Sequence, residues 1–326
     1  MKKSSDKKKM TVRKEVEEAE KRIRSHIRET PVEYSPYLSK VGNGEVYLKL
    51  ENTQFSGSFK LRGAMNKLLS LSREEIAQGV VTASSGNHGA AFAYVLKKFH
   101  WKGCVYLPET ASKAKVETLR LYDTEVRFYG DDCVKSEMFA KAEAEKTGQV
   151  FISPYNDLKI IGGQGTVAVE LARQLHSMDA VLVPVGGGGL ASGMGGYFKS
   201  FDSGSKIIGC QPQNSDVMFR SIKAGRILDM PSKPTLSDGT AGGIEKGAIT
   251  FDICREVVDD FILVSEDEIK DAIRLIVEKH GLLIEGSAAL SVASFIKERK
   301  RFKNQCVVLI LTGAKISVDQ LKKVLG

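Results

Sequence analysis

The 326-residue chain lacks several features that would assign it to a specialised class of protein. No apolar run is long enough to cross a bilayer, and the polar, basic first ten residues do not resemble a signal peptide. The five cysteines are odd in number and show no C-x-x-C spacing, which favours free thiols in a reducing compartment. We therefore expect a cytoplasmic globular protein that does not act at a membrane.

Acidic residues are fewer than basic residues, 40 against 48, and the formal net charge is +8. Much of this excess comes from lysines near the N-terminus, where we expect residues 1–10 to form a disordered, solvated tail. Downstream, arginines are not interleaved with aromatic residues as they would be on a surface that stacks bases. The positive charge therefore does not predict a nucleic-acid partner.

Short runs rich in Val, Ile and Tyr alternate with amphipathic helical stretches, which indicates an α/β fold. Some runs, such as AVLVPV and VVLIL, are apolar at successive positions, as in strands of a parallel sheet that helices cover on both faces. Strands are predicted at 46–50, 80–82, 103–107, 125–129, 150–152, 180–185, 206–210, 261–264 and 306–311. Helices are predicted at 134–147, 165–176, 266–280 and 288–299. An apolar stripe over 12–27 predicts an N-terminal helix whose end is marked by Pro31.

Four consecutive glycines, Gly186, Gly187, Gly188 and Gly189, follow the predicted strand 180–185 and precede a helical stretch. A strand, a glycine loop and a helix N-terminus together present several backbone N–H groups to one anion. The loop has no G-K-[ST] of a P-loop and only loosely fits a dinucleotide loop. A cofactor with a single phosphate is the ligand this loop favours, and a flexible turn is the plain alternative.

Lys60 lies in the small, polar segment NTQFSGSFKLRG, without acidic neighbours in the sequence. A solvated surface lysine is the default interpretation. In a small, partly apolar pocket, however, the ammonium form loses solvation, so the pKa falls and the amine becomes a nucleophile toward an aldehyde. Pyridoxal phosphate carries both an aldehyde and one phosphate. Lys60 and the glycine loop are therefore predicted to hold two ends of the same cofactor.

The ordered motifs SGSFKLRGA, ASSGNHGAA, PVGGGGLASG, IEGSAAL and LTGAK resemble those of the serine/threonine dehydratase and serine racemase family. The resemblance runs from about Arg28 to the C-terminus. It implies a fold type II, tryptophan synthase β-like enzyme with two three-layer α/β domains and pyridoxal 5'-phosphate between them. The large domain would comprise 11–68 and 155–326, and the small domain 69–154. A homodimer is the usual state of this family.

The resemblance also implies a role for each matching residue. Lys60 would bond to the cofactor aldehyde and later move the Cα proton, with Phe59 against one face of the ring and Gly239 against the other. Asn87 would bond the phenolic oxygen, Thr312 would face the pyridine nitrogen, and Glu285 would lie near that ring edge. The cofactor phosphate would contact Gly186, Gly187, Gly188, Gly189 and the amide of Leu190. The substrate carboxylate would contact Ser84, Ser85, Asn87 and His88.

Taken without the resemblance, some of these residues have simpler interpretations. The 84–89 turn could cap a helix, Glu285 could be an acid at a helix N-terminus, and Thr312 could be a turn residue at a strand end. The sequence also departs from the family in three places. Lys315 ends TGAK where S-G-G-N is usual, Ser85 matches the racemases, and Gln211 and Val217 stand where a racemase metal site needs acids. With Asp216 alone, we expect no metal there.

The residues and the resemblance together predict an L-threonine/L-serine dehydratase (ammonia-lyase) that releases a 2-oxo acid and ammonia from a β-hydroxy amino acid. Two alternatives share the site: a serine racemase, and a dehydratase for 3-hydroxyaspartate or a hydroxyectoine-derived amino acid. A nicotinamide oxidoreductase that uses the glycine loop and a non-catalytic binding protein also stay open. The sequence does not identify the β-hydroxy amino acid.

Overall fold

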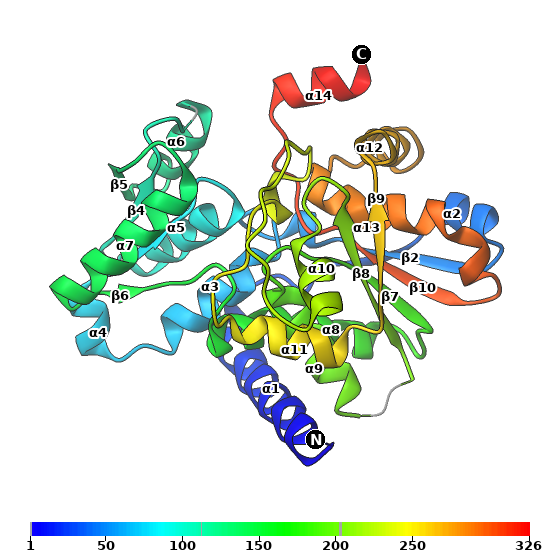
Figure 1. The fold of residues 1–326 in the computed structure, drawn as a ribbon, viewed down its shortest axis with the longest axis horizontal. Helices are drawn as coiled ribbons and strands as arrows, with labels where there is room; N and C mark the ends of the chain where they lie inside the picture. Colours follow the sequence, from blue (N-terminus) through cyan, green and yellow to red (C-terminus); the bar gives the residue numbers. More distant parts are fainter. Residues whose placement is uncertain (1, 112, 202–203) are drawn as a thin grey trace.

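The computed structural model describes residues 2–111, 113–201 and 204–326, and it contains two separate β-sheets (Figure 1). The six-stranded sheet has the order β1-β2-β10-β7-β8-β9. Its strands are β1 Val32–Tyr34, β2 Glu45–Lys49, β7 Ala180–Pro184, β8 Lys206–Pro212, β9 Asp260–Val264 and β10 Cys306–Ile310. The four-stranded sheet has the order β5-β4-β3-β6. Its strands are β3 Val80–Ala83, β4 Gly103–Leu107, β5 Glu125–Phe128 and β6 Val150–Phe151.

Helices separate most of the strands, as the alternating sequence pattern predicts. They are α1 Lys2–Ile23, α2 Pro36–Gly42, α3 Lys60–Leu69, α4 Arg73–Gln78, α5 Asn87–Phe99, α6 Lys113–Arg120, α7 Cys133–Thr147, α8 Leu158–Gln174, α9 Gly189–Lys199, α10 Val217–Ala224, α11 Ile249–Val257, α12 Glu266–His280, α13 Gly286–Lys297 and α14 Val318–Leu325. Short 3₁₀ turns include η1 Arg24–His26, η2 Glu51–Thr53, η3 Asp238–Thr240 and η4 Arg299–Phe302. No helix in these described segments is both long and apolar enough to span a bilayer.

The six-stranded sheet is apolar on both faces, because its neighbouring residues point alternately to two cores. Leu182 and Leu309 pack with α12 and α13 on one face, whereas Val181 and Val308 pack with α8, α9 and α11 on the other. The four-stranded sheet is likewise covered on both faces, by α3, α5 and α6 on one side and by α7 on the other. All strand pairs are parallel except β1 with β2. This confirms the α/β fold with helix-covered parallel sheets.

Three details differ from the sequence-based predictions. Residues 2–10, predicted as a disordered tail, are the first part of α1, because lysine and methionine are favourable residues in a helix. That helix ends at Ile23 and passes into η1, well before Pro31. Helix α8 begins at Leu158 rather than near 165, since the Asp157 carboxylate accepts hydrogen bonds from two backbone N–H groups and caps it.

Candidate functional site

Lys60 is the first residue of α3, and the segment before it runs beside the carboxyl end of β10. The Phe59 N–H donates to the Thr312 carbonyl at 3.1 Å, and Ser58 forms an isolated antiparallel bridge with Gly313. These backbone contacts hold Phe59, Lys60 and Thr312 at one end of the six-stranded sheet. That end, where parallel strands finish, is where α/β folds commonly bind ligands.

The Lys60 amine is half-buried and hydrogen-bonded, which rules out the solvated surface lysine. Its Nζ donates to the Pro154 carbonyl at 2.8 Å and lies 5.4 Å from the centre of the Phe59 ring. Burial lowers the pKa of this amine to about 8, although the carboxylates of Glu285 and Glu137 oppose the shift. A large share of the amine is therefore uncharged at mildly alkaline pH, as a nucleophile or a proton acceptor requires.

Asn87 and Glu285 form a polar pair near Lys60, although 198 positions separate them in the chain. The Asn87 Nδ2 donates to both carboxylate oxygens of Glu285 at 2.8 Å. Glu285 precedes α13 as its N-cap, yet its side chain makes no capping hydrogen bond. Glu285 therefore is an acid at a helix N-terminus, but its carboxylate bonds to Asn87 and does not cap the helix.

The carboxylate of Glu285 is almost completely buried and has mostly neutral partners. Besides Asn87, it accepts a hydrogen bond from the Lys315 backbone N–H at 3.2 Å. Burial raises the pKa of Glu285 to about 7, and the two donors only partly offset that rise. Two glycines leave room for the carboxylate: a Cβ on Gly313 would lie 2.7 Å from Oε1, and one on Gly239 would lie 3.6 Å from it.

The turn between β3 and α5 carries the residues predicted to meet a substrate carboxylate. Ser84 and Ser85 are half-buried, and the Ser84 hydroxyl accepts a hydrogen bond from the Gly86 N–H at 3.2 Å. His88 is buried, and its Nε2 lies 3.1 Å from the Ile152 carbonyl. Burial, together with the charge of Lys60, lowers the pKa of His88 to about 3, so its ring is neutral.

The glycine loop links β7 to α9 and is packed from both sides. On one side, a Cβ on Gly187 would lie 2.4 Å from the ring of Tyr155. On the other, Gly188 has a left-handed φ of 85°, and an added Cβ would lie 2.8 Å from the Cys254 sulfur. Glycine is therefore required for a positive φ at one position and for close approach at the other. The glycine loop therefore packs on Tyr155, and the residue before it, Pro154, accepts the hydrogen bond from the Lys60 amine.

Several buried polar atoms around this site have no hydrogen-bond partner among the described residues. Those on predicted site residues or beside them are Ser58 Oγ, Asn87 Oδ1, His88 Nδ1 and Thr312 Oγ1. Buried polar groups are almost always paired, so such a group of unpaired atoms indicates a ligand with matching donors and acceptors. A hydroxylated pyridine with an aldehyde and a phosphate fits this set, the Lys60 amine and the glycine cradle.

Comparison with known proteins agrees with this chemistry. The family described as pyridoxal-phosphate dependent enzyme (PALP) matches residues 23–313. The chain belongs to the pyridoxal phosphate-dependent enzyme family. It is 37% identical to the L-threonine ammonia-lyase of Thermotoga maritima, over 97% of this chain and 79% of that protein. It is also 37% identical to the serine racemase of Dictyostelium discoideum, over 96% of this chain and 97% of that protein.

A solved structure shares the fold of this pyridoxal phosphate enzyme. The processed form of threonine deaminase isoform 2 from Solanum lycopersicum superposes with a TM-score of 0.92 at 32% identity. The match covers 97% of this chain and 87% of that chain. These similarities confirm the predicted family, the type II fold and the cofactor.

The two remaining departures from the family pattern have visible structural consequences. Although much of the Lys315 side chain is exposed, the surrounding protein lowers the pKa of its amine to about 8, against the attraction of Glu285. At the racemase metal position, the Asp216 carboxylate accepts both of its 2.8 Å contacts from the Arg220 Nε. The Gln211 side chain bonds the Val185 carbonyl and the Phe219 N–H. The expectation that no metal binds at this position stays a prediction.

The sequence did not identify the residues that reach the site from the side of the four-stranded sheet. Tyr155 covers the glycine loop, and its hydroxyl accepts a hydrogen bond from the Glu245 N–H at 2.9 Å. The Glu137 carboxylate on α7 acts on the charge of Lys60, and it pairs with Lys141, which also binds Glu245. No motif marks these residues, because only the packing of the two sheets brings them close to Lys60.

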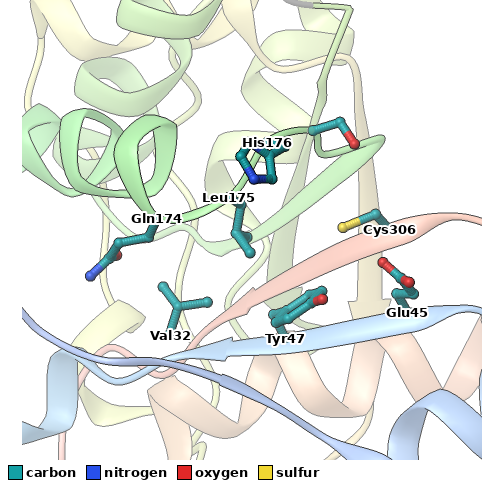
Figure 2. A pocket seen from close by; sticks show the side chains of 8 residues that line it. Val32, Glu45, Tyr47, Gln174, Leu175, His176 and Cys306 are labelled. Carbon is teal, nitrogen blue, oxygen red and sulfur yellow. The ribbon is translucent and has the colours of Figure 1, made fainter.

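A separate surface cavity of about 510 Å³ lies at the edge of the six-stranded sheet, near β1 and β2 (Figure 2). Its lining includes Glu45, Tyr47, His176 and Cys306. None of these residues is a predicted site residue, and nothing in the described structure identifies a ligand there.

Proposed function

We propose that the protein is an L-threonine/L-serine ammonia-lyase that eliminates the β-hydroxyl group of its substrate to give a 2-oxo acid and ammonia. The observation that carries the proposal is the Lys60 amine, which is half-buried, has a pKa of about 8 and lies beside the Asn87–Glu285 pair. The names of the Thermotoga and Solanum relatives support this reaction and this substrate class.

The residues proposed to hold the cofactor come from five segments that the fold brings together. They are Phe59, Lys60, Asn87, Gly186, Gly187, Gly188, Gly189, Leu190, Gly239, Glu285 and Thr312. When bound, pyridoxal phosphate supplies a covalent bond to the substrate amine and a conjugated ring that spreads the charge left at Cα. The N-terminus of α9 and its glycine amides suit the phosphate, because they present N–H groups and the positive end of the helix dipole.

Lys60 is proposed to take the Cα proton of the substrate. A general base works best when its pKa lies near the working pH, and the half-buried amine meets that condition. The Pro154 carbonyl holds the amine in place, and the nearby Glu285 and Glu137 carboxylates stabilise the ammonium form that results. Thr312 would offer only a neutral hydroxyl to the ring nitrogen, so it would add no charge there.

Ser84, Ser85, Asn87 and His88 are proposed to receive the substrate carboxylate. Their turn precedes the N-terminus of α5, whose first backbone N–H groups and positive dipole end suit a carboxylate. With a pKa of about 3, His88 is uncharged at neutral pH, so it can position the substrate by hydrogen bonding but does not supply positive charge.

The two sheets support the proposed division into a large domain of 11–68 and 155–326 and a small domain of 69–154. Strands β3 to β6 all lie within the second range, and the other strands lie within the first. Helix α3 nevertheless packs on the four-stranded sheet through Leu61, Ala64, Met65 and Leu68. Closure of the small domain would exclude water from the Lys60 amine.

We also propose a cytoplasmic location and a homodimer. All five cysteines are free thiols in the structure, which suits a reducing compartment. The dimer is supported by the family resemblance, and light scattering of the purified protein at several concentrations tests it. A mass of one chain, 35.7 kDa, at all concentrations would contradict it.

The function is tested by a screen of β-hydroxy amino acids for 2-oxo acid release. We expect turnover of L-threonine and L-serine. Release of a 2-oxo acid from 3-hydroxyaspartate alone would show that the proposed substrate is wrong. Borohydride reduction followed by peptide mapping should fix the cofactor to Lys60 and not to Lys67, a lysine on the same helix. An unmodified Lys60 in active protein would overturn the proposed site.

A serine racemase is the alternative that shares these residues, and the Dictyostelium relative is one. The feature that favours it is Ser85, a half-buried hydroxyl in the turn beside Asn87. Chiral analysis of the products from L-serine separates the two activities. Loss of D-serine in Ser85→Ala with 2-oxo acid release retained would show that both reactions use this site.

A further inference from the structure

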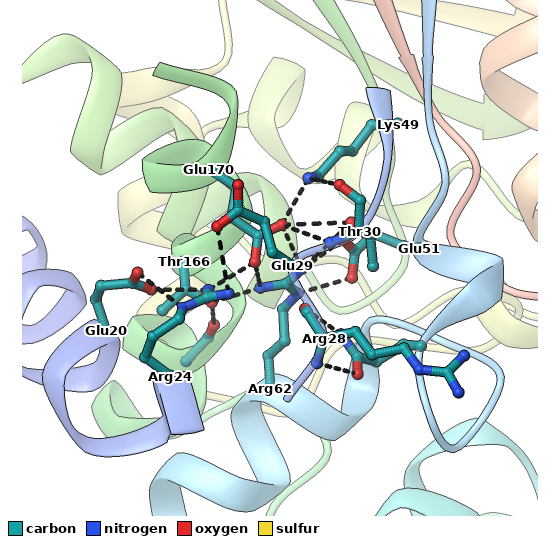
Figure 3. Close-up of polar contacts among 12 residues, drawn as sticks. Glu20, Arg24, Arg28, Glu29, Thr30, Lys49, Glu51, Arg62, Thr166 and Glu170 are labelled. Atoms are coloured by element: carbon teal, nitrogen blue, oxygen red, sulfur yellow. Dashed lines mark hydrogen bonds and ion pairs between the residues drawn. The ribbon is translucent and has the colours of Figure 1, made fainter. Parts of the chain in front are cut away.

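A group of charged side chains is buried around Arg62, two residues after Lys60 on α3 (Figure 3). We call it the Arg62 cluster. Its fully buried members are Thr30, Lys49, Glu51, Arg62, Thr166 and Glu170. They come from the segment after η1, from β2, η2, α3 and α8, so the cluster joins parts of the chain that are far apart in sequence.

Arg62 is the centre of the cluster and uses both edges of its guanidinium group. Its Nε and Nη2 donate to the two carboxylate oxygens of Glu51 at 2.7 Å, which is the bidentate geometry. Its Nη1 and Nη2 donate to the two oxygens of Glu170 at 2.7 and 2.8 Å, and Nη1 also reaches the Thr166 hydroxyl at 3.1 Å. The guanidinium group is therefore fixed in a single orientation.

The pair of Glu51 and Arg62 brackets the segment that carries Lys60. Glu51 lies at the start of η2, Arg62 is the third residue of α3, and the loop with Ser58 and Phe59 runs between them. Successive residues of an α-helix are about 100° apart, so the Lys60 and Arg62 side chains leave α3 on nearly opposite sides. The pair thus holds the segment from behind, while the Lys60 amine faces Pro154.

Stability alone does not account for this arrangement, because charges lose their hydration on burial and apolar residues of similar size often serve as well or better. The cluster also has a second part that does not touch the bracketed segment. Lys49 donates to Glu170, to the Thr30 carbonyl and to the Gln174 side chain. This second part provides a matched control, since it shares the burial and the Glu170 partner.

We propose that Arg62 and Glu51 are positioning residues for Lys60: their bidentate pair fixes the first turn of α3 and the preceding loop, so that the amine lies where it meets the cofactor aldehyde and the substrate Cα. The inference rests on the proposed role of Lys60. It assigns a role in the reaction to two residues that touch neither cofactor nor substrate.

The test compares Arg62→Lys and Glu51→Gln with Lys49→Met in full-length protein. Arg62→Lys keeps the charge but loses the fork, and Glu51→Gln keeps the shape but loses the charge. The rate of cofactor uptake by cofactor-free protein is followed by absorbance from pH 6 to 10, and kcat and KM for L-threonine are measured separately.

For both Arg62→Lys and Glu51→Gln, we expect kcat to fall on the order of 100-fold with little change in KM, because small misplacements of a reacting group have effects of that size. The pH midpoint of cofactor uptake should move up, since a less confined amine is better solvated. Lys49→Met should lower the melting temperature and leave the uptake midpoint and kcat near those of the wild type.

Folded Arg62→Lys and Glu51→Gln proteins with wild-type kcat and uptake midpoint would overturn the inference. An equal loss in Lys49→Met would also overturn it, because the effect would then be general destabilisation. If the wild-type protein itself did not bond the cofactor at Lys60, the proposed function would fail and this inference with it. If the wild-type protein takes up the cofactor at Lys60 but the variants keep the wild-type kcat and uptake midpoint, the inference fails while the proposed function stands.

Discussion

Two buried carboxylates, Glu170 and Glu285, differ in the charge of their partners. Burial by itself raises the pKa of a carboxyl group, but at Glu170 the guanidinium of Arg62 and the ammonium of Lys49 outweigh burial and bring the pKa below its ordinary value. Glu285 has an amide and a backbone N–H as its partners, and burial raises its pKa to about 7. The contrast separates a carboxylate with a structural task from one that can gain or lose a proton near neutral pH.

The surroundings of the two carboxylates differ in the same way. Around Glu170, most polar contacts lie within the protein, with Arg24, Arg62, Lys49 and Thr30 all bonded to it, although Arg24 Nη1 lacks a hydrogen-bond partner among the described residues. Around Glu285, Asn87 Oδ1 and Thr312 Oγ1 lack partners within the described residues. Polar groups that are paired within the protein hold one another in place, whereas unpaired donors and acceptors can hydrogen-bond to a ligand.

The strongest test of the open region is Lys60→Ala, which removes the covalent anchor and the proposed base together. We expect ammonia release from L-threonine to fall by at least about 10⁴-fold, with the fold retained. Lys67→Ala on the same helix is the control and should keep most of the activity. The comparison would fail if Lys60→Ala kept activity within about tenfold of the wild type.

The closed region is tested by the free energy of unfolding in urea, measured on cofactor-free protein. Glu170→Gln leaves Arg62 and Lys49 buried without a full counter-charge, so we expect a loss of about 3–5 kcal/mol. Glu285→Gln should cost less than about 1 kcal/mol, because the Asn87 amide can rotate and offer its unpartnered oxygen to the new amide group. Similar losses in the two variants would remove the distinction.

The pH dependence of cofactor uptake sharpens the role of Glu285. The neutral Lys60 amine is the reactive form, so uptake in the wild type should rise with pH around a midpoint near 8. The Glu285 carboxylate raises the pKa of Lys60, and Glu285→Gln should therefore lower that pKa and move the midpoint to lower pH. Glu278→Gln, an exposed carboxylate on α12, should leave the midpoint unchanged, and a shift to higher pH in Glu285→Gln would contradict the assignment.

A smaller effect is expected from Gly187→Ala in the glycine loop. The added methyl group would meet the Tyr155 ring, and overpacking of this kind costs about 1–2 kcal/mol, or about tenfold in cofactor affinity. Gly243→Ala is the matched control, because an added Cβ there has no heavy atom within 4 Å. Equilibrium dialysis measures both affinities, and equal values would show that the cradle tolerates a side chain.

Much of the fold follows from local sequence patterns, and the exceptions have physical causes. All nine predicted strands are present within one or two residues of their predicted ends, because buried parallel strands are apolar at successive positions. Strand β1 was missed, since VEY is short, largely exposed and defined only by its pairing with β2. The start of α8 was missed because Gly162, Gly163 and Gly165 look unlike helix, although they allow α8 to pack closely on its neighbours.

In the candidate site too, some residues could be identified from the sequence, whereas others depend on how the chain packs. Motifs marked Lys60, Asn87, Glu285 and the glycine loop, because their spacing resembles a known family. Arg62 and Glu170 look like ordinary surface residues in the sequence, since nothing local shows that β2, η2, α3 and α8 will bury them together. Tyr155 was equally invisible, because its contact with the glycine loop depends on where the chain returns from the four-stranded sheet.

The Pro154 carbonyl that holds the Lys60 amine belongs to this returning crossover, three residues after β6 and before the cap of α8. The bond joins the first residue of α3 to the segment that links β6 with α8. A single peptide oxygen outside the helix therefore sets the position of the amine.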